Sequence, residues 1–196
     1  MKLEAPGLEN EIVRLELLTE ADRAAVEGTG VDEAMWTWMP VIPTGTNLNT
    51  YFDLAMHDWK AGTMVPFKIY RQEDGAFAGF VGYVAVSRTH RRLRIGWLWH
   101  PPEMRGTAVV PATQLLLIQR ALDARIRRIE YAFPEENERA IRAMEKIGVR
   151  QEGVLRDYMR TAGGTWANVV VMSLVESEAK AAIALLEDRV RALQQA

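Results

Sequence analysis

The sequence predicts a mixed α/β fold in which helices flank a mostly antiparallel sheet. Residues 65–71, 76–87 and 92–99 have strand-like patterns, and an Asp-Gly turn joins the first two into a hairpin. Residues 48–59, by contrast, repeat apolar side chains at helical spacing until Gly62 ends the helix. Because both patterns occur in neighbouring segments, we expect strands and helices to share one domain.

The N-terminal segment predicts a further strand and a further helix. Residues 12–17 alternate as a strand does, and Thr19 with Asp22 forms a capping pair that opens a helix over about residues 20–27. Residues 30–46 are interrupted by glycine and proline and predict a loop. The chain therefore begins in the order strand, helix, helix.

The C-terminal half continues the alternation. Residues 108–124 predict an apolar helix, 128–133 a buried strand and 135–147 another helix, before a final hairpin closes the sheet. Ser177 can cap a last helix, whose apolar residues occupy a and d positions: Ile183, Leu186, Val190 and Leu193. This seam needs a partner. Packing on its own domain and a contact between two subunits of a dimer are equally open.

Length and composition restrict the class of protein. A chain of 196 residues fits one domain, and a net charge of −2 from interspersed charges favours neither nucleic acid nor an anionic membrane as partner. Cysteine is absent, which excludes disulfides and thiolate catalysis, and His57, His90 and His100 lack the spacing of metal ligands. The histidine spacing leads us to expect no metal site. There is no signal-like segment and no apolar run of about 18 residues, so we expect a cytoplasmic protein.

The most informative local feature is the junction between the strand at 94–99 and the helix at 108–124. An Arg105-Gly106-Thr107 turn lies directly before that helix, whose first backbone N–H groups lack intrahelical partners and carry the positive end of the macrodipole. Such a junction suits a pyrophosphate, so we expect a phosphate-bearing cofactor. Neither a P-loop nor the G-x-G-x-x-G motif of dinucleotide folds is present.

The junction resembles the acetyl-coenzyme A signature of the GNAT (Gcn-related N-acetyltransferase) superfamily, and most closely the subgroup of ribosomal-protein N-terminal acetyltransferases. Three further segments resemble that subgroup in the same order: 8–22, 137–148 and the hairpin of 152–174. The resemblance implies a twisted, mostly antiparallel sheet of about seven strands, with the GNAT-like domain at 8–175. Residues 176–196 would then form a C-terminal amphipathic helix, packed on the domain or on a dimer partner.

The resemblance implies acetyl-coenzyme A as co-substrate and assigns residues that would bind it: Trp99, Arg105, Gly106, Thr107, Ala108, Val109, Val110 and Asn137. Two of them depart from the family pattern, because Ala108 replaces a glycine and Val110 a small residue. A backbone with φ above zero would be strained at either position. Asn137 could equally be a plain helix cap.

The expected reaction is direct attack of a primary amine, on a protein N-terminus or a small molecule, on the thioester. Glu130 and His100 are candidate bases acting through water, although Glu130 could instead be a surface residue and His100 a solvated loop residue. Many members of the superfamily use a tyrosine to protonate the leaving thiolate, and Met144 occupies that position in this chain. Trp36 and Trp38 lie where the superfamily builds its acceptor pocket, although contacts under a loop would explain them as well.

Two other classes of function were considered. Ala108, Val110 and Met144 are also compatible with a non-catalytic acyl-coenzyme A binder or a repurposed domain of this fold. A hydrolase finds little support, since no serine of the chain lies in a G-x-S-x-G motif.

Overall fold

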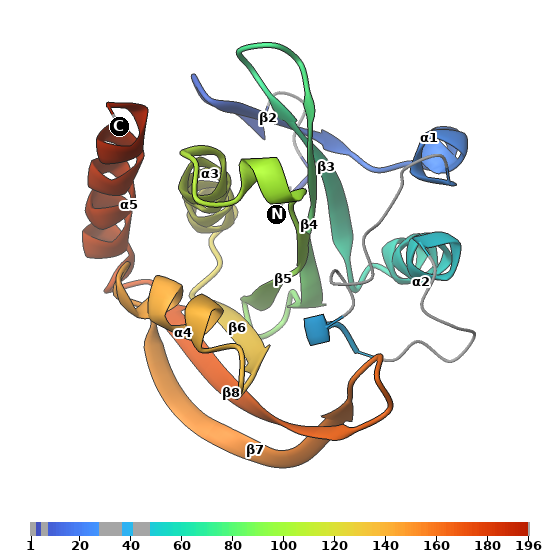
Figure 1. The fold of residues 1–196 in the computed structure, drawn as a ribbon. Helices are drawn as coiled ribbons and strands as arrows, with labels where there is room; N and C mark the ends of the chain where they lie inside the picture. Colours follow the sequence, from blue (N-terminus) through green and yellow to red (C-terminus); the bar gives the residue numbers. More distant parts are fainter. Residues whose placement is uncertain (1–2, 5–7, 28–36, 41–47, 196) are drawn as a thin grey trace.

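A computed structural model describes residues 3–4, 8–27, 37–40 and 48–195 (Figure 1). Its strands are β1 (Leu8–Glu9), β2 (Val13–Leu17), β3 (Val65–Arg71), β4 (Phe77–Ser87), β5 (Arg92–Trp99), β6 (Arg128–Pro134), β7 (Arg150–Arg160) and β8 (Trp166–Val175). Its helices are α1 (Arg23–Glu27), α2 (Leu48–Lys60), α3 (Val109–Asp123), α4 (Glu138–Glu145) and α5 (Ala179–Gln194). Short 3-10 turns precede α1 and α3, at Glu20–Asp22 and Pro102–Met104.

All the strands of the described residues form one sheet of eight, in the order β1-β2-β3-β4-β5-β6-β8-β7. The pairing of β5 with β6 is parallel, and every other pairing is antiparallel. The mixed α/β, mostly antiparallel prediction is therefore confirmed. The strand beyond the expected seven is β1, whose two residues pair with β2.

The two faces of the sheet are covered by different helices. Helices α3 and α5 lie on one face and α1 and α2 on the other, while the β7–β8 hairpin curves away below (Figure 1). Each face has its own apolar cluster. The larger contains residues of α3 and α5, and the smaller contains residues of α1 and α2 with Phe80 and Trp99 of the sheet.

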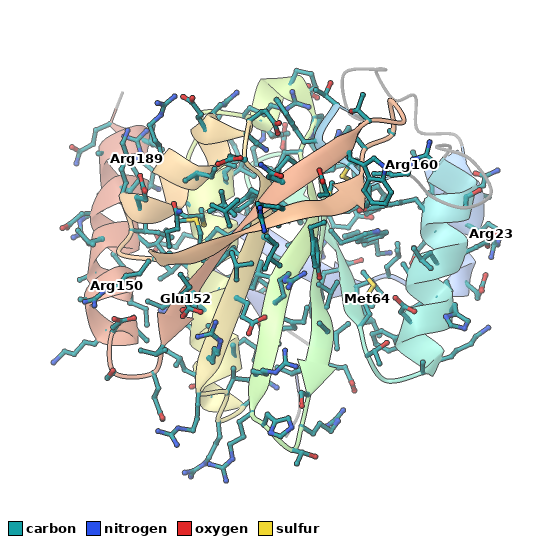
Figure 2. All side chains as sticks on the ribbon, turned by 90° about the horizontal axis from the view of Figure 1, so that it is seen from below. Arg23, Met64, Arg150, Glu152, Arg160 and Arg189 are labelled. Carbon is teal, nitrogen blue, oxygen red and sulfur yellow. The ribbon has the colours of Figure 1, made fainter. Side chains whose placement is uncertain are left out.

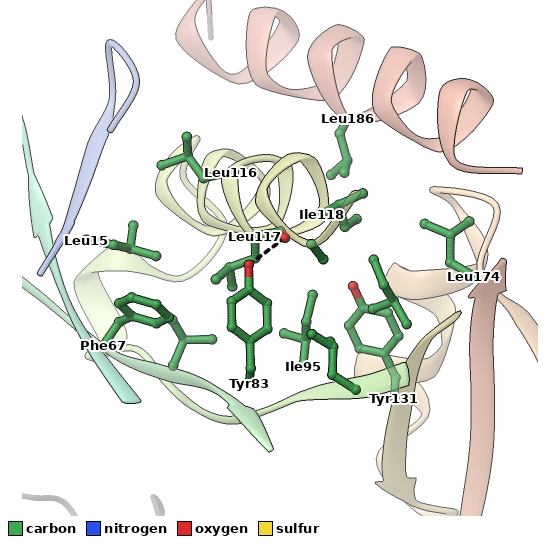
Figure 3. Packing of buried hydrophobic residues seen from close by; sticks show 14 of the residues in the cluster. Leu15, Phe67, Tyr83, Ile95, Leu116, Leu117, Ile118, Tyr131, Leu174 and Leu186 are labelled. Carbon is green, nitrogen blue, oxygen red and sulfur yellow. Dashed lines mark hydrogen bonds between the residues drawn. The ribbon is translucent and has the colours of Figure 1, made fainter. Parts of the chain in front are cut away.

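The larger cluster fixes α3 on the sheet. Buried Tyr83 of β4 donates its hydroxyl to the backbone oxygen of Leu117 at 2.7 Å, and apolar side chains of both layers surround this bond (Figure 3). Burial of one such apolar side chain contributes about 1.5–3 kcal/mol. The bond helps to fix the position of α3 relative to the sheet. It therefore also helps to fix the loop that precedes α3.

The amphipathic seam of α5 faces α3. Leu186 is buried in the larger cluster (Figure 3). Ile183 and Val190 are partly buried against the same cluster. The helix begins one residue later than expected, because Glu178 rather than Ser177 is the N-cap. Within the described residues, no helix is long and apolar enough to span a membrane. The homodimer and the cytoplasmic location stay predictions.

Candidate functional site

The sheet opens between its two central strands. Strands β5 and β6 pair over three residues, ending at Arg94 and Glu130. Beyond that pair β5 continues along β4 as far as Trp99, and β6 continues along β8 as far as Pro134. Among the described residues neither strand has a pairing partner on the side that faces the other. Their backbone groups there are available to a ligand.

A bulge in β5 follows Gly96, two residues beyond the last residue that pairs with β6. The β4–β5 register shifts between the Gly82–Gly96 and Phe80–Trp99 pairs, and Trp97 at the bulge has a φ of 53°. A positive φ is uncommon for a residue with a side chain, and such strain is concentrated at functional sites. A bulge bends its strand, and this one lies in the part of β5 that no longer pairs with β6.

Close backbone packing supports the bulge from the β4 side. Gly79 has a φ of 125°, and a Cβ there would lie 2.0 Å from the backbone oxygen of Trp99. No side chain can be accommodated at that distance. Gly79 thus lets β4 approach the end of β5.

The turn predicted to bind phosphate lies beyond the end of β5. The backbone N–H groups of Gly106, Thr107, Ala108 and Val110 donate to no acceptor within the described part of the chain. The amide of Val109 is engaged, since it donates to the Thr107 hydroxyl at 3.2 Å. Arg105 is fixed beside them because its Nε donates to the backbone oxygen of His100 at 2.9 Å. Unpaired amides, a helix N-terminus and an arginine together suit a phosphate.

The strain expected from Ala108 and Val110 is not found. Ala108 has a φ of −64° as the N-cap of α3, and Val110 lies in the first turn of that helix. Only Gly106 of this turn has a positive φ, 78°, and open space surrounds the position of its absent Cβ. The departures from the family pattern therefore require no unfavourable backbone angle.

His100 is buried rather than solvated, with 6% of its surface exposed. Its Nδ1 lies 2.7 Å from the backbone oxygen of Ala78, which can only accept, so Nδ1 carries the proton. Its Nε2 is buried and has no partner among the described residues. Burial lowers the pKa of His100 to about 4, so the ring is neutral near pH 7 and Nε2 is an acceptor.

Glu130 is also buried, with 9% exposed, and is not the surface residue that was the alternative. Its Oε1 accepts from Nε of Arg128 at 2.8 Å, and its Oε2 lies 3.7 Å from Arg92 and 3.8 Å from Arg94. Arg128 in turn binds both carboxylate oxygens of Glu152. The carboxylate of Glu130 thus lies at the last β5–β6 pair among three guanidinium groups.

Aromatic rings border the same opening on the side of α2. Trp97 stacks on Tyr51 of α2 with centroids 4.9 Å apart, and lies 5.4 Å from Phe80. Trp97 and Trp99 both pack with the smaller apolar cluster. The indole nitrogens of both tryptophans are buried without a partner in the described residues.

The remaining candidates lie around this opening or outside the description. Trp38 is half exposed at 41%, in a short segment where Pro40 pairs with Thr161 of the β7–β8 turn, and Trp36 lies outside the described residues. Asn137 caps α4, because its Oδ1 accepts from the amide of Ala140 at 3.3 Å. Met144 is buried in the larger apolar cluster, and its thioether cannot donate a proton.

Three residues of this site were not identified from the sequence: Arg92, Arg94 and Tyr51. Arg92 and Arg94 alternate with buried Leu93 and Ile95, a period-two signal that places both guanidinium groups on one face of β5. Tyr51 is one of several buried residues of α2, and no sequence signal connects it with Trp97.

Comparison with known proteins places these features in a family context. Residues 13–150 match the model of the acetyltransferase (GNAT) domain. No curated protein matches the chain in sequence. Among solved structures, a protein of T. thermophilus assigned as an acetyltransferase is 26% identical, with a TM-score of 0.81 over 96% of this chain and 99% of that one.

Two further structures contain coenzyme A or its disulfide. Mycobacterium smegmatis RimJ in complex with CoA-disulfide is 22% identical, with a TM-score of 0.77 over 91% of this chain and 90% of that one. Spermidine N-acetyltransferase from Vibrio cholerae, in complex with CoA and spermine, is 16% identical, with a TM-score of 0.73 over 87% and 99%. At these identities the likeness is one of fold.

Proposed function

This chain belongs to the GNAT acetyltransferase family, and we propose that it transfers the acetyl group of acetyl-coenzyme A to a primary amine in a ternary complex. One observation carries the proposal. The opening between β5 and β6 begins beside a buried carboxylate, Glu130, and β5 leads from there to the unpaired amides before α3. An activated acyl group and a proton acceptor can therefore meet at one place.

The residues present fit coenzyme A. The amides of Gly106, Thr107, Ala108 and Val110, with Arg105 beside them, would hold the pyrophosphate at the N-terminus of α3. Asn137 would hydrogen-bond the pantetheine arm through its amide nitrogen while its oxygen caps α4. The same path would be bordered by Trp99, at the end of β5, and by Val109, whose amide donates to the Thr107 hydroxyl.

The co-substrate supplies an acyl carbon to which the amine nitrogen bonds, while the bond from that carbon to sulfur breaks and the sulfur leaves as thiolate. The unpaired backbone N–H groups of β5 beyond Arg94 would stabilise negative charge on the carbonyl oxygen. Glu130 would accept, through a water molecule, one proton of the substrate's ammonium group, so that the neutral amine attacks the acyl carbon. The nitrogen loses its second proton to water as the bond to sulfur breaks. His100, neutral and with a bare Nε2, is the second candidate acceptor.

No side chain at Met144 can protonate the thiolate. A thiol has a pKa of about 8.5, so sulfur leaves as an anion near neutral pH without an acid. We therefore propose that water supplies that proton. We propose Trp38 and Trp36 as residues of the acceptor side. Pro40, two residues after Trp38, pairs with Thr161 of the β7–β8 turn.

Isothermal titration with acetyl-coenzyme A tests the binding step. We expect micromolar affinity that is lost in Gly106→Trp. The matched control is Gly75→Trp, because Gly75 has a similar φ of 71° and equally open surroundings in a turn between β3 and β4. Equal affinity in both variants, or no binding at millimolar cofactor, would overturn the proposal.

Release of coenzyme A with a panel of primary amines tests the transfer step. Glu130→Gln should lower kcat by roughly 10²–10⁴-fold with cofactor affinity retained. Tight binding of the cofactor without acetylation of any amine would instead favour the alternative function, a non-catalytic acyl-coenzyme A binder.

A further inference from the structure

The face of the sheet that bears Glu130 carries more cationic than anionic groups. Arg92 and Arg94 of β5 and Arg128 of β6 point to it, together with Glu130 and, from β7, Glu152. In Figure 2 this face is seen from below, with Glu152 labelled left of the centre, α2 at the right and the β7–β8 hairpin crossing it. Three guanidinium groups thus share two carboxylates.

One of the three is fully satisfied. Arg128 donates to Glu130 at 2.8 Å and to both oxygens of Glu152 at 2.6 and 2.5 Å, and Ser173 donates to Glu152 at 2.5 Å. These bonds hold the pKa of Glu152 at about 2 and consume most of the acceptor capacity of that carboxylate. Glu152 therefore has little left to offer the arginines of β5.

Arg92 and Arg94 are not satisfied in the same way. Their closest carboxylate oxygen, Oε2 of Glu130, is 3.7 and 3.8 Å away, beyond hydrogen-bonding distance. Neither guanidinium makes a hydrogen bond within the described residues, and Nε of Arg94 is buried without a partner. The side chains of Arg92 and Arg94 are 42% and 27% exposed, so a ligand can reach both, and only Nε of Arg94 is a buried unpaired donor. An unpaired charged donor costs free energy where it is buried, so this arrangement favours binding of an added anion.

The position of the two arginines connects them with the acceptor. Arg94 is the last residue of β5 that pairs with β6, and the opening begins after it. An amine that approaches Glu130 from this face passes within reach of both guanidinium groups. A planar guanidinium matches a carboxylate in two parallel hydrogen bonds.

We propose that the acceptor is a primary amine that also carries a carboxylate close to its nitrogen, bound by Arg94 and Arg92. The inference rests on the proposed acetyl transfer and names the substrate class for that same site. A polyamine, which is the substrate named for the Vibrio cholerae relative, would bring further positive charge to a face that already has an excess of it. The carboxylate belongs either to a free amino acid or to an acidic first side chain of a peptide.

Pairs of acceptors that differ only in that charge test the inference on the unmodified protein. The first arm compares amino acids with their α-carboxamides, and the second compares peptide amides that begin with Asp and with Asn. A roughly 10- to 100-fold higher kcat/KM for the charged member in one arm supports the proposal and identifies the source of the carboxylate. Equal values in both arms, or preference for the carboxamides or for spermidine, would overturn it while leaving acetyl transfer intact.

Variants then locate the binding group. Arg94→Met and Arg92→Met should raise KM for the charged acceptor about tenfold or more and leave KM for its uncharged partner within about threefold. Arg94→Lys, which keeps the charge but not the planar fork, should lie between. The control is Arg14→Met, which removes the same charge from distant β2, where Arg14 pairs with Glu16. An equal rise in KM for both acceptors, or the same rise in the control, would contradict a carboxylate contact, and absence of any acetylated amine would overturn the proposed function itself.

Discussion

The indole ring of Trp97 is stacked on the ring of Tyr51, with the ring centroids 4.9 Å apart and the planes inclined by 10°. Trp97 lies at the β5 bulge, beyond the residues that pair with β6, and Tyr51 belongs to α2. The hydroxyl of Tyr51 also donates to the sulfur of Met39 at 3.8 Å. One buried tyrosine thus joins the bulge, the helix layer and the segment that meets the β7–β8 turn.

We expect Tyr51→Leu to destabilise the protein by about 2 kcal/mol and to raise the KM of the acceptor. The substitution removes the stacked ring and leaves Trp97 without its support. Urea unfolding, followed by tryptophan fluorescence, measures the first effect and steady-state kinetics the second. Tyr51→Phe is the control because it keeps the ring and should cost at most about 1 kcal/mol. If the two variants are equally stable, the stack contributes nothing.

Ala108→Gly should leave the affinity for coenzyme A within about threefold of the original value. Ala108 has a φ of −64°, so glycine relieves no strain there and only adds flexibility at the N-cap. Gly106→Ala is the contrasting variant, because a φ of 78° is unfavourable for alanine by about 1 kcal/mol or more. Calorimetric titration of both variants measures the difference. Tighter binding by Ala108→Gly would show that the alanine does weaken cofactor binding at the turn before α3.

The order of elements followed from local patterns. Capping pairs, glycine stops and two kinds of periodicity placed α2, α3, α4 and the β3–β4 hairpin within a few residues of their observed bounds. The turn at Arg105 to Ala108 was recognisable for the same reason, since consecutive residues build it. Strand β1 was not separated from β2 because two residues carry no periodic signal.

Tertiary contacts account for what the sequence could not predict. The sequence left two roles open for His100, a catalytic base and a solvated loop residue. Its environment depends on a contact with Ala78, which lies 22 residues earlier in the chain. The environment of Glu130 depends on arginines of two strands and on Glu152 of a third. Its position at the end of β5–β6 pairing is a matter of register, which no single segment specifies.

Gly79→Ala should destabilise the fold by about 3 kcal/mol or more. Its Cβ would lie 2.0 Å from the backbone oxygen of Trp99, and β4 or β5 would have to move. Gly153→Ala on β7 is the matched control, since nothing lies within 4 Å of its added Cβ. The free energy of unfolding in urea compares the two variants. Equal stability would mean that the end of β5 is free to shift.

Protonation of His100 should destabilise the protein between about pH 6.5 and pH 4. Desolvation is the main cause of its lowered pKa, about 4 in the folded state against 6.5 in an unfolded chain. In that interval the unfolded chain binds a proton that the folded protein does not, so stability is complete above pH 6.5 and falls as the pH falls, by about 1.4 kcal/mol per pH unit. His100→Asn keeps a donor near the position of Nδ1 for the backbone oxygen of Ala78 but cannot be protonated.

Unfolding free energies at pH 5, 6 and 7 compare the two proteins, and the variant should lose most of the slope that His100 contributes. The carboxylate of Glu152 does not interfere, because hydrogen bonds from Arg128 and Ser173 hold its folded pKa at about 2. The stability that Glu152 contributes is present above its ordinary pKa of 4.5 and is lost below it, outside the range of the experiment. If the slope between pH 5 and pH 7 is the same in both proteins, His100 is accessible to protons in the folded state and its Nε2 is not the buried acceptor described above.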